Sequence, residues 1–169
     1  MLRLEFPNES HKAQWEEMFE EWRKYESIPT SPWLLFKGEN FEEFLDYVQH
    51  TSQWGYNGKT QSTLYFWIVG DKIIWAIDIR HNIIHPSLRD YSGHIGYWVR
   101  PSERGKWYAT QMLALWLIEA KKLWIEKVLI SCHPDNPVSQ KVILKNGWVY
   151  EKTVCDEKWW EYMRHWIEL

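Results

Sequence analysis

Two stretches near the N-terminus carry apolar residues at the spacing of an amphipathic helix. Apolar side chains recur at this spacing over residues 10–26 and again over residues 40–53, which predicts a helix in each stretch. Ser10 and Asn40 stand at the first position of these stretches, where an N-cap side chain accepts a hydrogen bond from the first turn. The segment between them contains two prolines and a glycine, so it is predicted to be a loop.

The middle of the chain changes to the pattern of strands. Residues 62–82 contain two runs rich in β-branched and aromatic residues around Gly70 and Asp71, which is a strong signal for a β-hairpin. Residues 93–101 predict a further strand, which ends at Pro101 because proline cannot donate to a sheet. The N-terminal run, residues 2–6, alternates in the same way and predicts a short strand.

Helices and strands alternate in the last third of the chain. The predicted elements are a helix over residues 106–123, a buried strand over 125–132, a short helix over 136–147, and strands over 148–155 and 162–169. The resulting order is β–α–α–β–β–β–α–β–α–β–β. The fold class is therefore α/β, a mixed β-sheet of about six to seven strands flanked by about four helices.

Composition narrows the function less than the pattern does. A chain of 169 residues suits a single domain, residues 1–169, with a substantial core. Its 20 basic and 23 acidic residues give no basic face for nucleic acid and no sign of a membrane partner. Cys132 and Cys155 have no partner at metal-ligand spacing, so no metal is expected. They suit two reduced thiols in a cytoplasmic protein.

The residues between the predicted strand over 93–101 and the long helix suggest a phosphate site. Arg104, Gly105 and Lys106 lead directly into Tyr108 and Ala109 at the start of the helix. A tight loop at a helix N-terminus directs unpaired backbone N–H groups at one point, where basic side chains can add charge-assisted bonds. The alternative is an ordinary strand–turn–helix with solvated basic residues.

This segment resembles the acetyl-CoA pyrophosphate loop of the GNAT superfamily of N-acyltransferases, R/Q-x-x-G-x-G/A, with Arg104 at its first position and Ala109 at its last. The wider string "AIDIRH … GHIGYWVRPSERGKWYAT … KVLISC … KNGW" is similar to one bacterial branch of that superfamily, over roughly residues 60 to 169. The resemblance implies a GNAT-like fold and acetyl-CoA as cosubstrate. The cofactor-binding residues that it implies are Tyr97, Trp98, Val99, Arg100, Arg104, Gly105, Lys106, Trp107, Tyr108, Ala109 and Asn136.

The resemblance also implies N-acetylation of a primary amine, of a small molecule or a peptide, by direct attack in a ternary complex. Backbone N–H groups of residues 97–99 would bind the thioester oxygen. His94 lies near the usual position of the general base, although a hydrogen-bonded structural histidine is the alternative. Where the superfamily often has an acidic tyrosine stands Ile143, which leaves Ser139 as the nearest hydroxyl. Asn136 would hold the pantetheine arm or serve only as a helix N-cap.

Several departures from the family pattern replace glycine with tryptophan. The chain has 14 tryptophans and only 8 glycines, and glycine is usual in the family branch at five positions held here by tryptophan: Trp75, Trp98, Trp107, Trp124 and Trp148. Engineering, or a codon that means tryptophan in one genetic code and glycine in another, would each explain the set. An indole at Trp107 would occupy the space of the pyrophosphate.

A blocked loop leaves two functions open. The chain is either an N-acetyltransferase or a non-catalytic binding or assembly module on the same scaffold with its cofactor site blocked by Trp107. The acceptor is not defined by the sequence, because the acidic N-terminal helices suit a cationic amine and a solvated helix face equally. The two C-terminal strands would offer a free edge for pairing in a homodimer.

Overall fold

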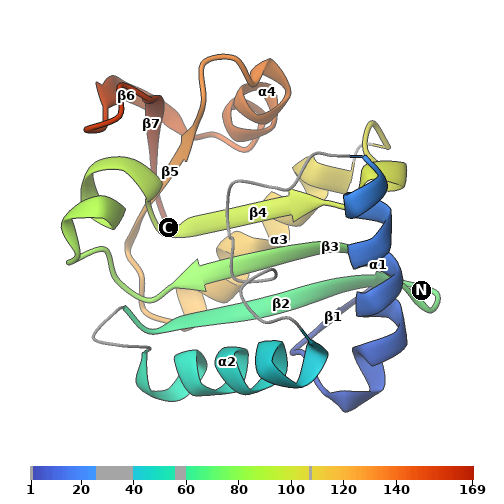
Figure 1. The fold of residues 1–169 in the computed structure, drawn as a ribbon. Helices are drawn as coiled ribbons and strands as arrows, with labels where there is room; N and C mark the ends of the chain where they lie inside the picture. The colour runs from blue at the N-terminus through green and yellow to red at the C-terminus, as the bar shows by residue number, and fades with distance from the viewer. Residues whose placement is uncertain (1, 26–39, 56–59, 107) are drawn as a thin grey trace. The chain divides into compact units, whose positions relative to one another are not determined.

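A computed structural model describes residues 2–25, 40–55, 60–106 and 108–169. In these residues, the chain forms seven strands and four α-helices in the predicted order. The strands are β1 (Leu2–Glu5), β2 (Ser62–Val69), β3 (Lys72–Arg80), β4 (Ile95–Val99), β5 (Lys127–Cys132), β6 (Val149–Cys155) and β7 (Glu161–Glu168). The helices are α1 (Lys12–Lys24), α2 (Phe41–Trp54), α3 (Tyr108–Lys122) and α4 (Pro137–Lys145) (Figure 1).

The strands form two antiparallel sheets and not a single one. One sheet has the order β1-β2-β3-β4, and the other has the order β5-β7-β6. In the first, Leu2 of β1 lies opposite Val69 of β2. In the second, the register between β6 and β7 shifts at a bulge between Tyr150 and Lys152. The predicted α/β fold class, with about six to seven strands and about four helices, is confirmed, and the described strands are divided between these two sheets.

The chain divides into two compact units. The first comprises residues 1–79 and 96–105, and its core is formed by apolar side chains of α1 and α2 packed against those of β2, β3 and β4. The second comprises residues 80–95 and 106–169. There α3 packs against α4, and β5 is apolar and buried along most of its length.

Local sequence signals account for most element ends. Asn40 caps α2 by accepting a hydrogen bond from the Glu43 N–H at 2.9 Å, as predicted. Gly70 has a φ of 61° in the turn between β2 and β3, which confirms the hairpin signal. Ser10 is not an N-cap. It lies inside a short 3-10 helix, η1 (Glu9–His11), that precedes α1 and is capped by Asn8.

The C-terminus of α3 ends in a left-handed residue. Ile125 donates its N–H to the Ala120 carbonyl at 3.2 Å, and Trp124 donates to the Lys121 carbonyl at 3.1 Å. These two bonds form a Schellman motif, in which the residue after the helix cap usually is glycine. Here that residue is Trp124, with a φ of 60° and 91% of its surface exposed.

The hairpin between β6 and β7 also contains a left-handed tryptophan. Asp156 and Trp160 pair across the turn through a 3.0 Å backbone bond, and Trp159 has a φ of 64° just before the strand resumes. A left-handed residue after the turn forms the glycine-type bulge of a longer hairpin loop. Among the described residues, Trp124 and Trp159 are the two that combine a positive φ with a side chain, and the other positive-φ residues are glycines.

Candidate active site

β4 is the last strand of the four-stranded sheet, and alternate residues of its backbone direct their N–H groups away from β3. Arg100 donates its N–H to the Ile74 carbonyl at 2.9 Å, and the His94 carbonyl accepts from Arg80 at 2.9 Å. Because successive residues of a strand alternate the direction of their backbone groups, Tyr97 and Val99 direct their N–H groups away from β3. The sequence predicts that backbone N–H groups of residues 97–99 polarise a thioester carbonyl. The Trp98 N–H points towards β3 and so, unlike those of Tyr97 and Val99, does not point to the free side of β4.

Arg100, directly after β4, is held by helix α1 of the same unit. Its side chain is 2% exposed and donates from Nε to Glu21 Oε2 at 2.5 Å and from Nη2 to Glu17 Oε1 at 2.7 Å. Glu21 also accepts the Ser102 N–H at 2.6 Å. These partners occupy the Arg100 guanidinium, so we assign it a structural position. Its binding of the cofactor remains a prediction without support from these contacts.

Further along the loop from Arg100, three residues in a row are exposed. Arg104, Gly105 and Lys106 all lie at the surface, and Arg104 donates from Nε to the Val99 carbonyl at 3.4 Å. Gly105 has a φ of 76°, a conformation that glycine adopts readily. A Cβ at Gly105 would meet no atom within 4 Å, so the backbone angle and not crowding is the constraint. Trp107 lies outside the described residues.

In the second unit, α3 begins directly after the loop. Tyr108 is its first residue and Ala109 its second, and both are half-buried. The first N–H groups of such a helix have no partner inside the helix and carry the positive end of its dipole. A helix N-terminus therefore follows the loop directly, and its binding of a phosphate stays a prediction.

His94 is buried and bound to β5. Its ring nitrogen Nδ1 accepts the Leu129 backbone N–H at 3.0 Å, and the backbone N–H of His94 donates to the Leu129 carbonyl at 2.8 Å. Burial, together with the Arg80 charge, lowers the pKa of His94 to about 4. With Nδ1 accepting, the proton of the neutral ring is on Nε2, so the basic lone pair is already used. The contacts therefore favour the structural alternative for His94 over the general base.

Gly93 explains why this segment lies so close to β5. A Cβ at Gly93 would stand 2.4 Å from the Leu129 carbonyl oxygen, a distance that no side chain tolerates. Gly93 also forms an isolated antiparallel bridge with Ile130. The glycine thus permits the close approach that fixes His94.

The start of α4 carries the remaining predicted residues. Asn136 Oδ1 accepts the Ser139 N–H at 3.0 Å, so Asn136 is the N-cap of α4, and Ser139 is buried. Ile143 is fully buried and cannot supply a proton. Burial also raises the pKa of the Cys132 thiol to about 11, which keeps it protonated and a poor nucleophile.

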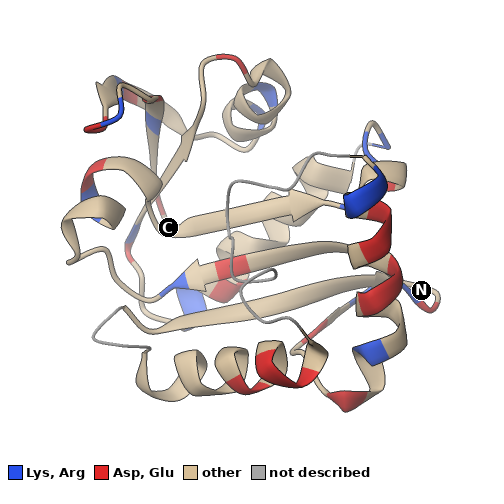
Figure 2. Cartoon of the chain, viewed as in Figure 1, with Lys and Arg blue, Asp and Glu red and all other residues tan. Residues whose placement is uncertain are grey.

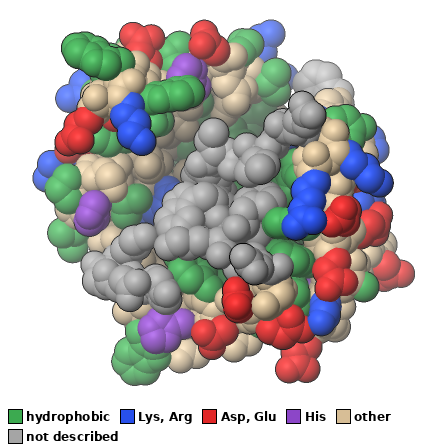
Figure 3. All heavy atoms as spheres, viewed as in Figure 1, with side chains coloured by type: hydrophobic (Ala, Val, Ile, Leu, Met, Phe, Trp, Pro, Cys, Tyr) green, Lys and Arg blue, Asp and Glu red, His purple; other side chains and the backbone are tan. Residues whose placement is uncertain are grey.

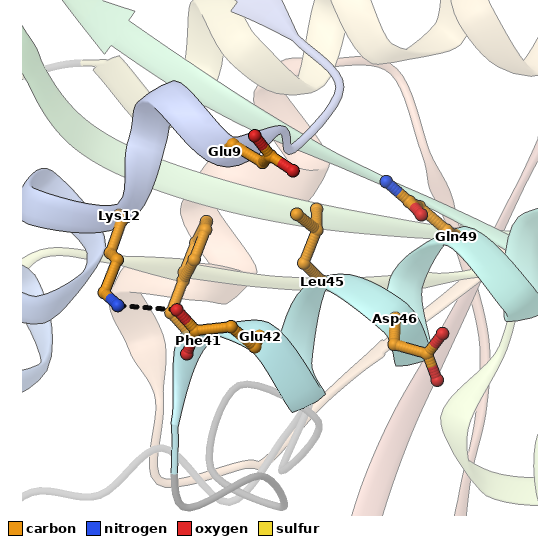
Figure 4. A pocket seen from close by; sticks show the side chains of 7 residues that line it. All are labelled: Glu9, Lys12, Phe41, Glu42, Leu45, Asp46 and Gln49. Atoms are coloured by element: carbon orange, nitrogen blue, oxygen red, sulfur yellow. Dashed lines mark hydrogen bonds and ion pairs between the residues drawn. The ribbon is translucent and has the colours of Figure 1, made fainter.

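A shallow, solvent-open pocket lies between η1, α1 and α2 in the first unit. Its volume is about 450 Å³. Phe41 and Leu45 line it with apolar surface, and Lys12 forms an ion pair with Glu42 at 2.5 Å (Figure 4). Acidic residues lie along α1 and α2 (Figure 2), and acidic side chains gather on the surface that these helices form (Figure 3). This surface suits cationic groups.

Residues 2–149 match the model of the acetyltransferase (GNAT) domain family. The chain belongs to the GNAT acetyltransferase family. No curated protein is similar enough in sequence to match it. The family resemblance predicted from the loop and the strands is thereby confirmed, and the chain is a GNAT-type acetyltransferase domain.

Solved structures of GNAT enzymes share the fold at low identity. RimJ of Mycobacterium smegmatis, in complex with a CoA disulfide, superposes with a TM-score of 0.75 at 18% identity, over 99% of this chain and 81% of RimJ. RimL, a ribosomal alpha-N-protein acetyltransferase in complex with coenzyme A, gives 0.73 at 20% identity, over 99% and 94%. A dodecameric spermidine N-acetyltransferase from Vibrio cholerae gives 0.69 at 18% identity, over 99% and 93%. None of the helices in the described ranges is long and apolar enough to cross a membrane.

Sequence reasoning missed the carboxylates that hold the start of the GNAT loop. Glu17 and Glu21 stand one helical turn apart on α1, which is a visible signal, yet nothing in the sequence indicates that they meet Arg100. Trp159 was also missed, because the family comparison drew attention to glycine positions elsewhere. The turn signal Asp156 and the resumption of strand pattern at Glu161 could have indicated it.

Proposed function

We propose that this GNAT domain transfers the acetyl group of acetyl-CoA to a primary amine by direct attack in a ternary complex. The observation that carries the proposal is the β4 edge, where Tyr97 and Val99 direct backbone N–H groups away from β3 immediately before the exposed loop. In the proposal, these N–H groups polarise the thioester carbonyl. CoA and acetyl-CoA complexes among structures of the same fold support the choice of cosubstrate.

The loop residues hold the pyrophosphate in this proposal. Arg104 and Lys106 supply charge, Gly105 lets the phosphates approach the backbone, and Tyr108 and Ala109 supply N–H groups of the helix start. Asn136 faces solvent at the start of α4 and is the proposed contact for the pantetheine arm. Trp107 stands at the centre of this loop in the sequence, which is the reason to expect weak binding by the chain as it is.

The proposed chemistry needs no protein acid or base with a special pKa. The amine nitrogen forms a bond to the acetyl carbon, and the bond between that carbon and the CoA sulfur breaks. The amine releases one proton to water, and water returns one to the CoA thiolate. His94, with its pKa lowered to about 4 and its Nδ1 occupied, is a positioning residue for the β4–β5 segment and not the base.

The acidic surface of α1 and α2 favours a cationic amine as acceptor (Figure 3). Structures of the same fold include an alpha-N-protein acetyltransferase of a ribosomal protein and a spermidine N-acetyltransferase, so an amine acceptor is consistent with the fold. We propose that the protein is located in the cytoplasm. We also propose that it assembles as a homodimer, with the exposed edge strand β6 as the contact between subunits.

A second candidate is a binding module without catalysis. Two residues favour it, namely Trp107 in the cofactor loop and Ile143 where a tyrosine acid is usual. A thiol-release assay separates the candidates, with acetyl-CoA, a panel of polyamines and peptides, the chain itself, Trp107→Gly, and Trp54→Gly as a matched control on α2. Amine-dependent thiol release by Trp107→Gly, exceeding that of both other proteins, supports the acetyltransferase. Absence of release from all three across the panel supports the binding module.

A further inference from the structure

The strand end that leads into the GNAT loop is tied to helix α1 by a cluster of ionic and backbone bonds, which we call the α1 clamp: Glu17, Glu21, Arg100 and Ser102. All four residues lie in the first unit. Figure 1 shows the end of β4 beside α1. We infer that Glu21 is a positioning residue for acetyl-CoA, because it fixes the backbone from which the cofactor loop starts. The inference rests on the proposed function.

Glu21 holds two different parts of the segment at once. One carboxylate oxygen accepts the Arg100 Nε bond at 2.5 Å, and the other accepts the Ser102 backbone N–H at 2.6 Å. A carboxylate with both oxygens engaged leaves its partners little freedom to rotate. Because one partner is main chain, Glu21 fixes the path of the polypeptide and not only a side chain.

Arg100 completes the clamp from the inside. It is 2% exposed, and besides its two carboxylates it donates its backbone N–H to the Ile74 carbonyl of β3. A buried guanidinium needs paired carboxylates, so Arg100 cannot leave this position cheaply. Arg104 lies four residues later and is exposed. The distance between the clamp and the proposed phosphate contacts is therefore short along the chain.

The protonation state of Glu21 suits this role. Burial opposes its ionisation, but the hydrogen bonds from Ser102 and Arg100 outweigh that effect and lower its pKa. Glu21 is therefore ionised at neutral pH. Its neighbour Glu20 lies on the exposed side of α1, where it pairs with Arg23 at 3.1 Å. Glu20 thus offers a matched control, because it has the same chemistry on the same helix without contact to the loop start.

The test compares Glu21→Gln with Glu20→Gln in the full chain and in Trp107→Gly. Amide hydrogen exchange of residues 102–106 is measured without ligand, and KM for acetyl-CoA and kcat are measured in the thiol-release assay. Glu21→Gln is expected to speed exchange in this segment and to raise KM about tenfold while kcat changes little, because a small misplacement of a binding group costs affinity steeply. Glu20→Gln is expected to change neither.

Three outcomes would overturn the inference. Unchanged exchange in Glu21→Gln would show that the carboxylate does not fix the segment. Faster exchange with unchanged KM would show that the clamp is structural only. Absence of acetyl-CoA binding in both backgrounds would refute the proposed function and the cofactor role together, while the exchange result still decides whether Glu21 holds the loop. Glu17→Gln, which removes one Arg100 contact and leaves Glu21 in place, provides an intermediate variant if Glu21→Gln does not fold.

Discussion

Four tryptophans of the described residues fall into two groups with opposite environments. Trp124 and Trp159 lie in turns, almost fully exposed, with left-handed backbone. Trp75 and Trp98 lie in strands of the four-stranded sheet and are buried. Trp75 stacks on Tyr97 with ring centroids 5.0 Å apart. In the turns the backbone conformation decides which residue fits, whereas in the sheet the packing decides.

The difference shows where a large side chain is a cost and where it is a gain. In the turns the indole buries almost nothing and the left-handed backbone disfavours any side chain. In the sheet the indole contributes buried apolar area, although Trp75 Nε1 has no hydrogen-bond partner among the described residues. We therefore expect the two turn tryptophans to strain the backbone of their turns and the two sheet tryptophans to stabilise the core. Substitution of these residues tests both expectations.

The largest effect is expected at Trp75. Trp75→Ala removes a large buried side chain from β3, so the free energy of unfolding should fall by about 3–5 kcal/mol. Urea denaturation followed by circular dichroism measures this loss. A variant as stable as the parent, or Trp75→Gly more stable than it, would mean that the sheet is built around a glycine and would erase the contrast between the two groups.

His94 is also buried, but its ring nitrogen Nδ1 has a hydrogen-bond partner, in contrast to Nε1 of Trp75. Its pKa falls from 6.5 to about 4 in the folded chain. The unfolded chain therefore binds a proton more readily, so stability is greatest above pH 6.5 and is lost as pH falls from 6.5 towards 4. The loss is about 3 kcal/mol.

His94→Asn keeps an acceptor for the Leu129 N–H and should remove most of this pH dependence. Denaturation midpoints of both proteins across pH 4–7 check the prediction. Parallel pH profiles for the two proteins would contradict it.

Substitution of Trp124 should have the opposite sign from that of Trp75. Trp124→Gly relieves the left-handed strain of the Schellman motif and should stabilise the chain by about 1 kcal/mol. Trp54 is an exposed tryptophan in the last turn of α2, where glycine should instead cost about 1 kcal/mol. Thermal unfolding of both variants tests whether the sign depends on φ and not on the loss of an exposed indole.

The smallest effect is expected at Trp159. Trp159→Gly should stabilise the β6–β7 hairpin by roughly 0.5–1 kcal/mol, because one residue of the loop returns to a favoured conformation. The gain should add to that of Trp124→Gly, since the two turns share no contact in the hydrogen-bond pattern of either motif. Strong non-additivity in the double variant would show that the turns are coupled and that local strain is the wrong explanation.

The sequence predicts what depends on nearby residues. The N-cap roles of Asn40 and Asn136 and the turn at Gly70 follow from side chains within three positions of the backbone that they serve. The order of helices and strands follows from apolar periodicity in the same way. The proposed cofactor loop could be predicted because its residues are contiguous.

Long-range geometry was beyond the sequence. Arg100 meets Glu21 across 79 positions, and no periodicity connects a strand end to that face of a helix. His94 was placed near a base position, but its Nδ1 bond to Leu129 depends on how β5 approaches Gly93. The division into two sheets likewise depends on pairing between strands that are distant in the chain.

Acetyl-CoA titration in a calorimeter tests the central claim most directly. The chain, Trp107→Gly and the control Trp54→Gly would be titrated under identical conditions. The account predicts saturable binding by Trp107→Gly and binding at least about tenfold weaker, or none, by the other two, because the resemblance to the family loop implies a glycine at this position for the approach of the pyrophosphate. Tight binding by the chain with Trp107 in place, or no binding by Trp107→Gly, would contradict it.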